Sequence, residues 1–313
     1  MLTRSQEGDV ETLALQVLLA KDVGDTLWRC LAAKEVLGLA RGATELWRLA
    51  LELLPERLPR PLPFALLSLD EKTTALRFLP LLESALLFDN FAAWDPGSCA
   101  LALEERGRLC RKAQHGCWEL GPGTESLPRM GRLLSGRSSC SGGLIALHAP
   151  LSIWCVQMIN ENPLTDYGPS GLVFRFNDVV RPRLLAFRCK VTAHRPHRAG
   201  AVLALATGMG NDKTPEGAGV FVHFTRQPEG RDVYASKFAD PVGHWRDGEW
   251  IDVRVGMNWK DRMLRVLLTH ADGSTGDVRE MPFNDMGCEG VRFLLLYNLT
   301  GDFESCWTDI LLI

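Results

Sequence analysis

The C-terminal half of the chain alternates apolar and polar residues with a period of two, beginning near Gly171. In residues 185–191, Leu185, Phe187 and Cys189 are separated by Ala186 and Arg188. Similar runs occupy residues 251–255, 264–268 and 291–297, and turn signals separate them at 247–248, 258–261, 272–273 and 301–302. Short alternating strands with no helical segments between them predict an antiparallel β-sandwich or barrel. One face of each strand is expected on the core and the other in water.

The N-terminal half has a different period. From Val10 to Leu54 the apolar residues recur every three or four positions without a proline, which predicts three short helices. Four prolines within residues 55–63 predict a semi-rigid spacer, and a second helical pair is expected over residues 68–91. Residues 95–141 could supply the first strands of the sandwich or a loop-rich lid.

The sequence therefore predicts an α+β chain, with N-terminal short helices and a C-terminal antiparallel β-sandwich. The expected divisions are 1–54 for the helical domain, 55–94 for the spacer and helical connector, and 95–313 for the sandwich. The alternating pattern is concentrated in residues 150–313.

Composition limits the expected partners and location. A formal net charge of −3 over 313 residues predicts no general attraction to nucleic acid or acidic membranes. The nine cysteines are odd in number and irregularly spaced, which favours reduced, buried thiols over a secreted disulfide framework. A polar N-terminus and the absence of any run of about 20 apolar residues predict no secretory signal and no membrane span. A cytoplasmic or nuclear protein is expected.

Several segments of the C-terminal half resemble the concanavalin A-like or laminin G-like jelly roll. The resemblance is carried by RPRLLAFRCKV (181–191), GVFVHF (219–224), GEWIDVRVGMNWKDRMLRVLL (248–268), MPF (281–283) and VRFLLLYNLTGDFESCWTDILL (291–312). Its most informative part is 248–268, in which a strand that begins with Trp is followed by a short hairpin and a second strand. Members of this family bind glycans, lipids or proteins, and some are hydrolases.

Residues 25–48 resemble an F-box, with Leu27, Cys30 and Leu31 on one helix and a Leu46-Trp47-Arg48 run opening another. The resemblance implies docking on the adaptor subunit of a cullin-RING ubiquitin ligase, with the second domain recruiting the substrate. The residues expected at the adaptor are Leu13, Leu27, Leu31, Leu46 and Trp47. The same apolar positions also fit the core of a purely structural helical domain, because an amphipathic face does not distinguish the two.

Catalytic and metal motifs are sparse. The Glu-x-Asp-x-x-Glu strand of retaining jelly-roll glycosidases is missing, as are a Gly-x-Ser-x-Gly elbow and a Walker loop. A non-catalytic protein without a cofactor is therefore expected. Possible zinc ligands (Cys110, His115 and Cys117, or His194 and His197) are better explained as thiols and solvated histidines. Asn211-Asp212 and Asn284-Asp285 are possible calcium loops but are above all turn residues.

Three residues of the sandwich are candidates for ligand binding. Trp245 lies in a GHWRDG loop and is the tryptophan expected to be most exposed, whereas Trp250 and Trp307 are expected to fill the core. Arg188 and Lys190 alternate onto one face that is expected to be solvated and could meet phosphate or an acidic partner.

Two functions follow from these patterns. The first is a non-catalytic substrate receptor of a ubiquitin ligase, with F-box-like helices and a lectin-like domain that binds a protein or glycoprotein client. The second is a carbohydrate- or protein-binding lectin-like module with structural N-terminal helices.

Overall fold

The computed structural model describes residues 85–89, 91, 111–113, 115–121, 129–133, 153–159, 170–196, 200–210, 215–236, 239–299 and 302–313. The chain divides into two compact units, 1–85 with 146–149 and 86–145 with 150–313, and the described residues from Leu86 onward belong to the second. The expected F-box-like helices and residues 1–54 lie outside the described residues. Across the described ranges, no helix is long and apolar enough to cross a membrane.

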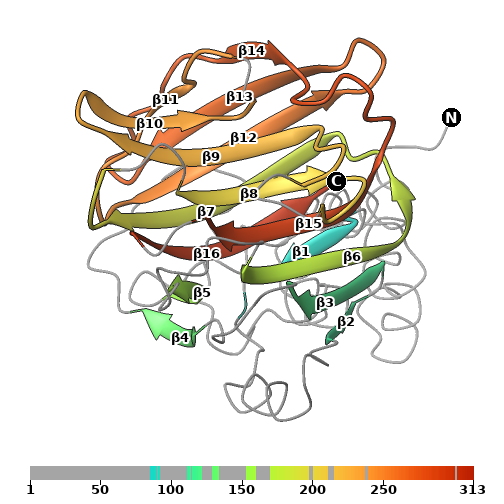
Figure 1. Ribbon diagram of the computed structural model, residues 1–313, viewed down its shortest axis with the longest axis horizontal. Coiled ribbons are helices and arrows are strands. Elements are labelled where there is room, and N and C mark those ends of the chain that lie inside the picture. The colour runs from blue at the N-terminus through green and yellow to red at the C-terminus, as the bar shows by residue number, and fades with distance from the viewer. Residues whose placement is uncertain are drawn as a thin grey trace, which may run out of the picture. The chain divides into compact units, whose positions relative to one another are not determined.

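The described strands form two antiparallel sheets (Figure 1). The first, sheet A, has β7 (Leu184–Ala193) and β16 (Phe303–Leu312) at its centre. In order across the sheet, the strands are β14 (Arg279–Pro282), β13 (Met263–His270), β12 (Trp250–Asn258), β7, β16, β5 (Ile153–Ile159) and β4 (Arg129–Leu133). β1 (Leu87–Asp89) also pairs with β16.

Sheet B is built in the same antiparallel manner around β8 (Ala201–Ala206) and β15 (Val291–Asn298). In order, its strands are β11 (Gly243–His244), β10 (Gly230–Tyr234), β9 (Val220–Gln227), β8, β15, β6 (Ser170–Val180), β3 (Gly116–Leu120) and β2 (Arg111–Ala113). Consecutive strands often lie in different sheets, as β6 and β7 do, so the chain crosses repeatedly between the two layers. This is an antiparallel β-sandwich, one of the two architectures that the alternating pattern predicts, and it is jelly-roll-like, as the resemblance implies.

Aromatic rings join the two sheets in the core. The Trp307 ring of β16 lies 5.7 Å from the Phe187 ring of β7 and 6.2 Å from the Phe224 ring of β9, measured between centroids. Because β16 and β7 belong to sheet A and β9 to sheet B, the contact of Trp307 with Phe224 crosses the space between the layers. Val253 and Val266 are fully buried in the same cluster, as the alternation predicts.

Sheet B departs from the expected pattern of one apolar face. Phe293, which the alternation assigned to the core, lies on the other face, next to a register shift against β6: β15 advances by two residues from Val291 to Phe293, whereas their partners Val180 and Arg175 are five residues apart. An irregularity of this kind interrupts the alternation of faces along a strand. Leu294 and Leu296 therefore enter the core, while the opposite face holds a second apolar cluster. That cluster includes Val173, Val202, Ala204, Phe221, Leu295 and Tyr297.

The segment that the sequence left open contributes strands. β2, β3 and β4 all lie within residues 95–141, and the buried Trp118 of β3 packs its ring 5.2 Å from that of Phe174. β1 occupies residues 87–89, where the end of a helix was expected. Its sequence, LFD, is too short to indicate a strand by alternation, and its pairing with β16 is what makes it one.

We predict that Trp307→Ala lowers the free energy of unfolding by about 3–5 kcal/mol, because it leaves a cavity where the two sheets meet. Chemical denaturation with Trp307→Phe in parallel should show a smaller loss. Val179→Ala is the matched control: its side chain is 62% exposed, so the change should stay within about 0.5 kcal/mol. Equal losses for Trp307→Ala and Val179→Ala would contradict the packing described here.

Candidate functional site

Trp245, the tryptophan expected to be exposed, is buried, with only 4% of its surface accessible. The preceding residues pair with β10 as β11, which turns the ring into the core. There the ring packs against those of Phe224 and Phe303, and its indole N–H donates a 2.8 Å hydrogen bond to the carbonyl of Thr225. The expected exposure is therefore wrong, and the face of this ring is not available to a sugar.

Arg188 is also buried, at 2% exposure, so the solvated face expected for it is wrong. Its Nε lies 2.7 Å from Oδ1 of Asp252, directly opposite on β12, and its guanidinium lies 5.7 Å from the Trp250 ring. A buried charge requires such a partner. Alternation gave the correct face for Arg188 but could not show that the face is buried.

Lys190 and Trp250 lie opposite each other on the same face of sheet A, away from the core. Lys190 is half-buried, and its ligand-binding role stays a prediction. Trp307 fills the core as expected, whereas Trp250 is buried in a separate small cluster with Cys155 and Cys306.

No three His, Cys, Asp or Glu side chains come together as a possible metal site within the described part of the chain. His194 pairs with Glu304, its Nε2 lying 3.0 Å from Oε1. Asp285 Oδ1 accepts a 2.7 Å hydrogen bond from the N–H of Gly287, the ordinary role of an aspartate in a turn. Cys110, His197, Asn211 and Asp212 lie outside the described residues.

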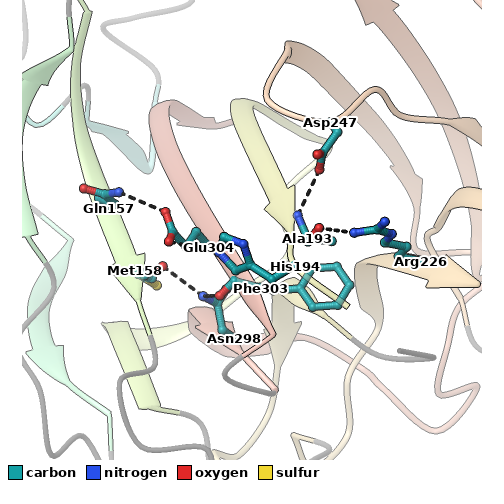
Figure 2. A network of polar contacts seen from close by, with 9 residues as sticks. All are labelled: Gln157, Met158, Ala193, His194, Arg226, Asp247, Asn298, Phe303 and Glu304. Carbon is teal, nitrogen blue, oxygen red and sulfur yellow. Dashed lines mark hydrogen bonds and ion pairs between the residues drawn. The ribbon is translucent and has the colours of Figure 1, made fainter. Parts of the chain in front are cut away.

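A polar network at one end of the sandwich joins several strands (Figure 2). The side-chain amide of Asn298 donates 2.9 Å hydrogen bonds to the carbonyls of Met158 and Phe303. Asp247 Oδ1 accepts the N–H of Ala193 at 2.9 Å, and Arg226 donates to the carbonyl of the same residue. These side chains are used to hold main-chain groups, so the network positions β5, β7, β15 and β16 relative to one another.

A second polar group lies on the face of sheet B that points away from the core, near its β11 edge. It consists of Tyr234, His223, Asp232 and His244, which we call the Tyr234 surface. Val233, between Asp232 and Tyr234, is in the core, so its two neighbours point outward together. Tyr234 is directly opposite His223, and their rings stack with centroids 5.0 Å apart and planes inclined by 13°.

Carboxylates border this stacked pair. Asp232 Oδ1 lies 2.8 Å from Nδ1 of His244, whose side chain is 76% exposed. Partial burial, with added repulsion from Asp232 and then Asp240, raises the pKa of the Tyr234 phenol. The phenol therefore keeps its proton at neutral pH and is able to both donate and accept hydrogen bonds.

The ring of His223, on which the Tyr234 ring stacks, is uncharged. Burial lowers the pKa of its imidazole from 6.5 to about 4, so the ring is uncharged at pH 7. Its other neighbour is the ring of Phe221, 5.2 Å away. Tyr234 is thus supported from beneath by apolar and uncharged aromatic groups.

Trp245 supports the Tyr234 surface from the core side. Its indole N–H donates a hydrogen bond to the carbonyl of Thr225, and its main-chain N–H donates a 3.1 Å hydrogen bond to the carbonyl of Arg231. Thr225 lies directly opposite Asp232, and its hydroxyl donates to the Asp232 carbonyl at 3.3 Å. The residue expected to touch the ligand is therefore placed under the strands that carry the surface.

Sequence reasoning missed Tyr234, although a signal was present. Reading Val233 as a core residue places Asp232 and Tyr234 together on the opposite face of a strand. An accessible aromatic ring bordered by carboxylates is able to stack on the apolar face of a sugar or on an organic cation, while the carboxylates accept hydrogen bonds from hydroxyl or ammonium groups.

The fold and this surface define an antiparallel β-sandwich with a candidate ligand-binding face. No protein-family model matches the chain. No curated protein matches it either.

Among solved structures, legume lectins are similar to about half of the chain. Lectin II from Ulex europaeus is 14% identical, with a TM-score of 0.35, over 51% of this chain and 86% of the lectin. The metal-free lectin I-B4 from Griffonia simplicifolia is 12% identical, with a TM-score of 0.34, over 51% and 87%. A legume lectin-like domain from Entamoeba histolytica is 9% identical, with a TM-score of 0.31, over 50% and 82%. At these identities and TM-scores, the assignment of a β-sandwich depends on the strand pairing and the core of this chain and not on the similarity.

We predict that acid destabilises the protein through His223. Its pKa is about 4 when folded and near 6.5 when unfolded, so the unfolded chain binds the proton more tightly between these values. Stability is retained above pH 6.5 and is lost as the pH falls toward 4. Between pH 7 and pH 4.5 the wild type should lose about 2 kcal/mol more than His223→Gln in denaturant titrations. Parallel losses in the two proteins would exclude a buried neutral imidazole.

Proposed function

We propose that the β-sandwich is a non-catalytic carbohydrate-binding domain and that neutral glycans bind at the Tyr234 surface. The observation that carries this proposal is the partly exposed Tyr234 ring, stacked on neutral His223, with Asp232 and Asp240 close enough to raise the pKa of its phenol. The C–H face of a pyranose ring is suited to stacking on Tyr234, and its hydroxyl groups are suited to donating hydrogen bonds to the carboxylates.

The charge of the surface favours some glycans over others. Asp232 and Asp240 both act on the Tyr234 phenol, so a sialylated or sulfated sugar would bring negative charge close to two carboxylates. Like charges at short range disfavour such a complex. Neutral hexoses and N-acetylated hexosamines are therefore the expected ligand class.

We predict that the full chain binds neutral glycans on an array and that Tyr234→Ala weakens the affinity about tenfold, which corresponds to about 1.4 kcal/mol. The expected cause is loss of the stacking face. Tyr234→Phe keeps the ring and should keep most of the affinity in isothermal titration. Met286→Ala is the control, since Met286 is 50% exposed and lies in a turn after β14.

If Tyr234→Ala keeps the wild-type glycan affinity and circular dichroism spectrum, the glycan does not bind at the Tyr234 surface and the proposal is wrong. Binding of lysine-rich peptides with no glycan binding would instead favour the protein-binding form of the domain, because an aromatic ring with carboxylates also suits a cation.

A second candidate function, the ubiquitin-ligase adaptor role, rests on the F-box-like pattern of residues 25–48. It is compatible with the first, since the sandwich would then recognise a protein or glycoprotein client for the ligase in the cytoplasm or nucleus. Leu13, Leu27, Leu31, Leu46 and Trp47 are the proposed adaptor contacts.

We predict that the full chain co-purifies with the ligase adaptor subunit and that the double variant Leu31→Asp/Trp47→Ala does not, because both changes remove apolar contact area. Thermal unfolding and glycan binding of the double variant should match the wild type. If the wild-type chain fails to co-purify with the adaptor subunit, the proposed adaptor contacts are wrong and the N-terminal helical pattern has a structural role only.

A further inference from the structure

Two cysteines lie side by side on neighbouring strands of sheet A. Cys306 of β16 is opposite Gln157 of β5, and the next pair in the register is Trp307 with Val156. Cys155 is therefore a diagonal neighbour of Cys306. Val156 and Trp307 point into the core, so both cysteines project from the other face of the sheet.

The two thiols contact each other. Cys155 and Cys306 are free thiols whose side chains are hydrogen-bonded to each other, in a small buried cluster with Trp250. Cys155 is 1% exposed and Cys306 is 5% exposed. Because Cys306 has the greater access, a small oxidant would reach it first.

The surroundings of the pair differ in charge. Lys190 of β7 is directly opposite Cys306 on the side away from β5. The hydrogen bond with Cys155 and the ammonium of Lys190 both lower the pKa of Cys306, whereas the hydrogen bond between the thiols and burial raise the pKa of Cys155. Cys306 is therefore the thiol that ionises first and acts as the nucleophile.

We propose that Cys155 and Cys306 form a redox-active pair that closes reversibly into a disulfide when a hydroperoxide reacts at Cys306. The pairing of the two strands, the contact between the sulfurs and the facing lysine carry the inference. It is independent of the glycan-binding proposal, because the pair lies on sheet A and the Tyr234 surface on sheet B.

The reaction balances in two steps. The Cys306 thiolate attacks one oxygen of hydrogen peroxide, the O–O bond breaks, and the departing hydroxide takes a proton to become water, leaving a sulfenic acid. The Cys155 sulfur then attacks the Cys306 sulfur, the S–O bond breaks, and the hydroxide leaves with the proton of Cys155 as a second water. Two thiols are oxidised by two electrons, and one peroxide is reduced to two waters.

The diagonal position makes the disulfide reversible. Diagonal neighbours across an antiparallel pair lie about 7–8 Å apart, slightly beyond the Cα separation of roughly 4.4–6.8 Å that disulfides usually have. Closing the bond therefore requires β5 to shift along β16, and a strained bond of this kind is reduced readily by thiols. The shift would act on Gln157, whose Nε2 lies 3.5 Å from Oε2 of Glu304 in the network of Figure 2.

The test is peroxide treatment of the full chain, followed by alkylation, non-reducing digestion and mass spectrometry. Chymotrypsin is the suitable protease, because cleavage after Trp154 separates Cys155 from Cys140. We expect a linked Cys155–Cys306 peptide that disappears on treatment with dithiothreitol. Cys288→Ser is the matched control, since Cys288 is buried and donates its S–H to the carbonyl of Gly290, and it should leave the linked peptide unchanged.

Single variants test the roles of the two sulfurs. Cys155→Ser should stop the reaction at a Cys306 sulfenic acid that a dimedone probe captures, whereas Cys306→Ser should leave Cys155 largely reduced. Lys190→Met should slow capture several-fold at neutral pH and much less at high pH, where Cys306 ionises without help. The proposal is overturned if both thiols stay reduced in folded protein, or if either forms its disulfide mainly with another cysteine.

Discussion

The contact of Trp307 with Phe187 and Phe224 joins the two sheets, and the polar edge of the same ring begins a buried hydrogen-bond chain. Its indole N–H donates to the Ser305 hydroxyl at 2.8 Å, and that hydroxyl donates to the Asn298 side-chain oxygen at 2.7 Å. The amide of Asn298 in β15 then holds the carbonyls of Met158 in β5 and Phe303 in β16. Trp307 thus takes part both in the apolar packing between the sheets and in the buried hydrogen-bond chain. A buried polar chain is favourable only when every member has a hydrogen-bond partner, so the chain depends on the indole N–H of this residue.

Alternation in the sequence predicted the inner faces of β7, β12 and β13, because each of these strands carries its apolar residues on one face only. It failed for β15, where VRFLLLYN is apolar on both faces and the register against β6 shifts between Val291 and Phe293. Arg188 shows a second limit. Parity places it outside the core, but only the tertiary structure provides Asp252 and buries the pair. The sandwich was therefore predictable, whereas the environment of its outer faces was not.

For the candidate site, residue type misled where strand context would have helped. Trp245 was chosen because of its loop-like sequence, but the short strand β11 directs it inward. Tyr234 was passed over in the short strand β10, next to the edge strand β11, where position relative to Val233 determines its direction. The thiol pair is harder still, because Cys155 and Cys306 are far apart in sequence and only the register of β5 against β16 brings them together.

The position of β16 in sheet A has a consequence for biosynthesis. This strand, residues 303–312, lies between β7 and β5 and also pairs with β1. These three segments are synthesised earlier and lack this pairing partner until β16 has been made. Until then the edges of β5 and β7 are unpaired, and exposed edges of this kind promote association between chains. Such long-range pairing also slows folding. The nascent protein therefore depends on protection of these edges until its final central strand has been synthesised.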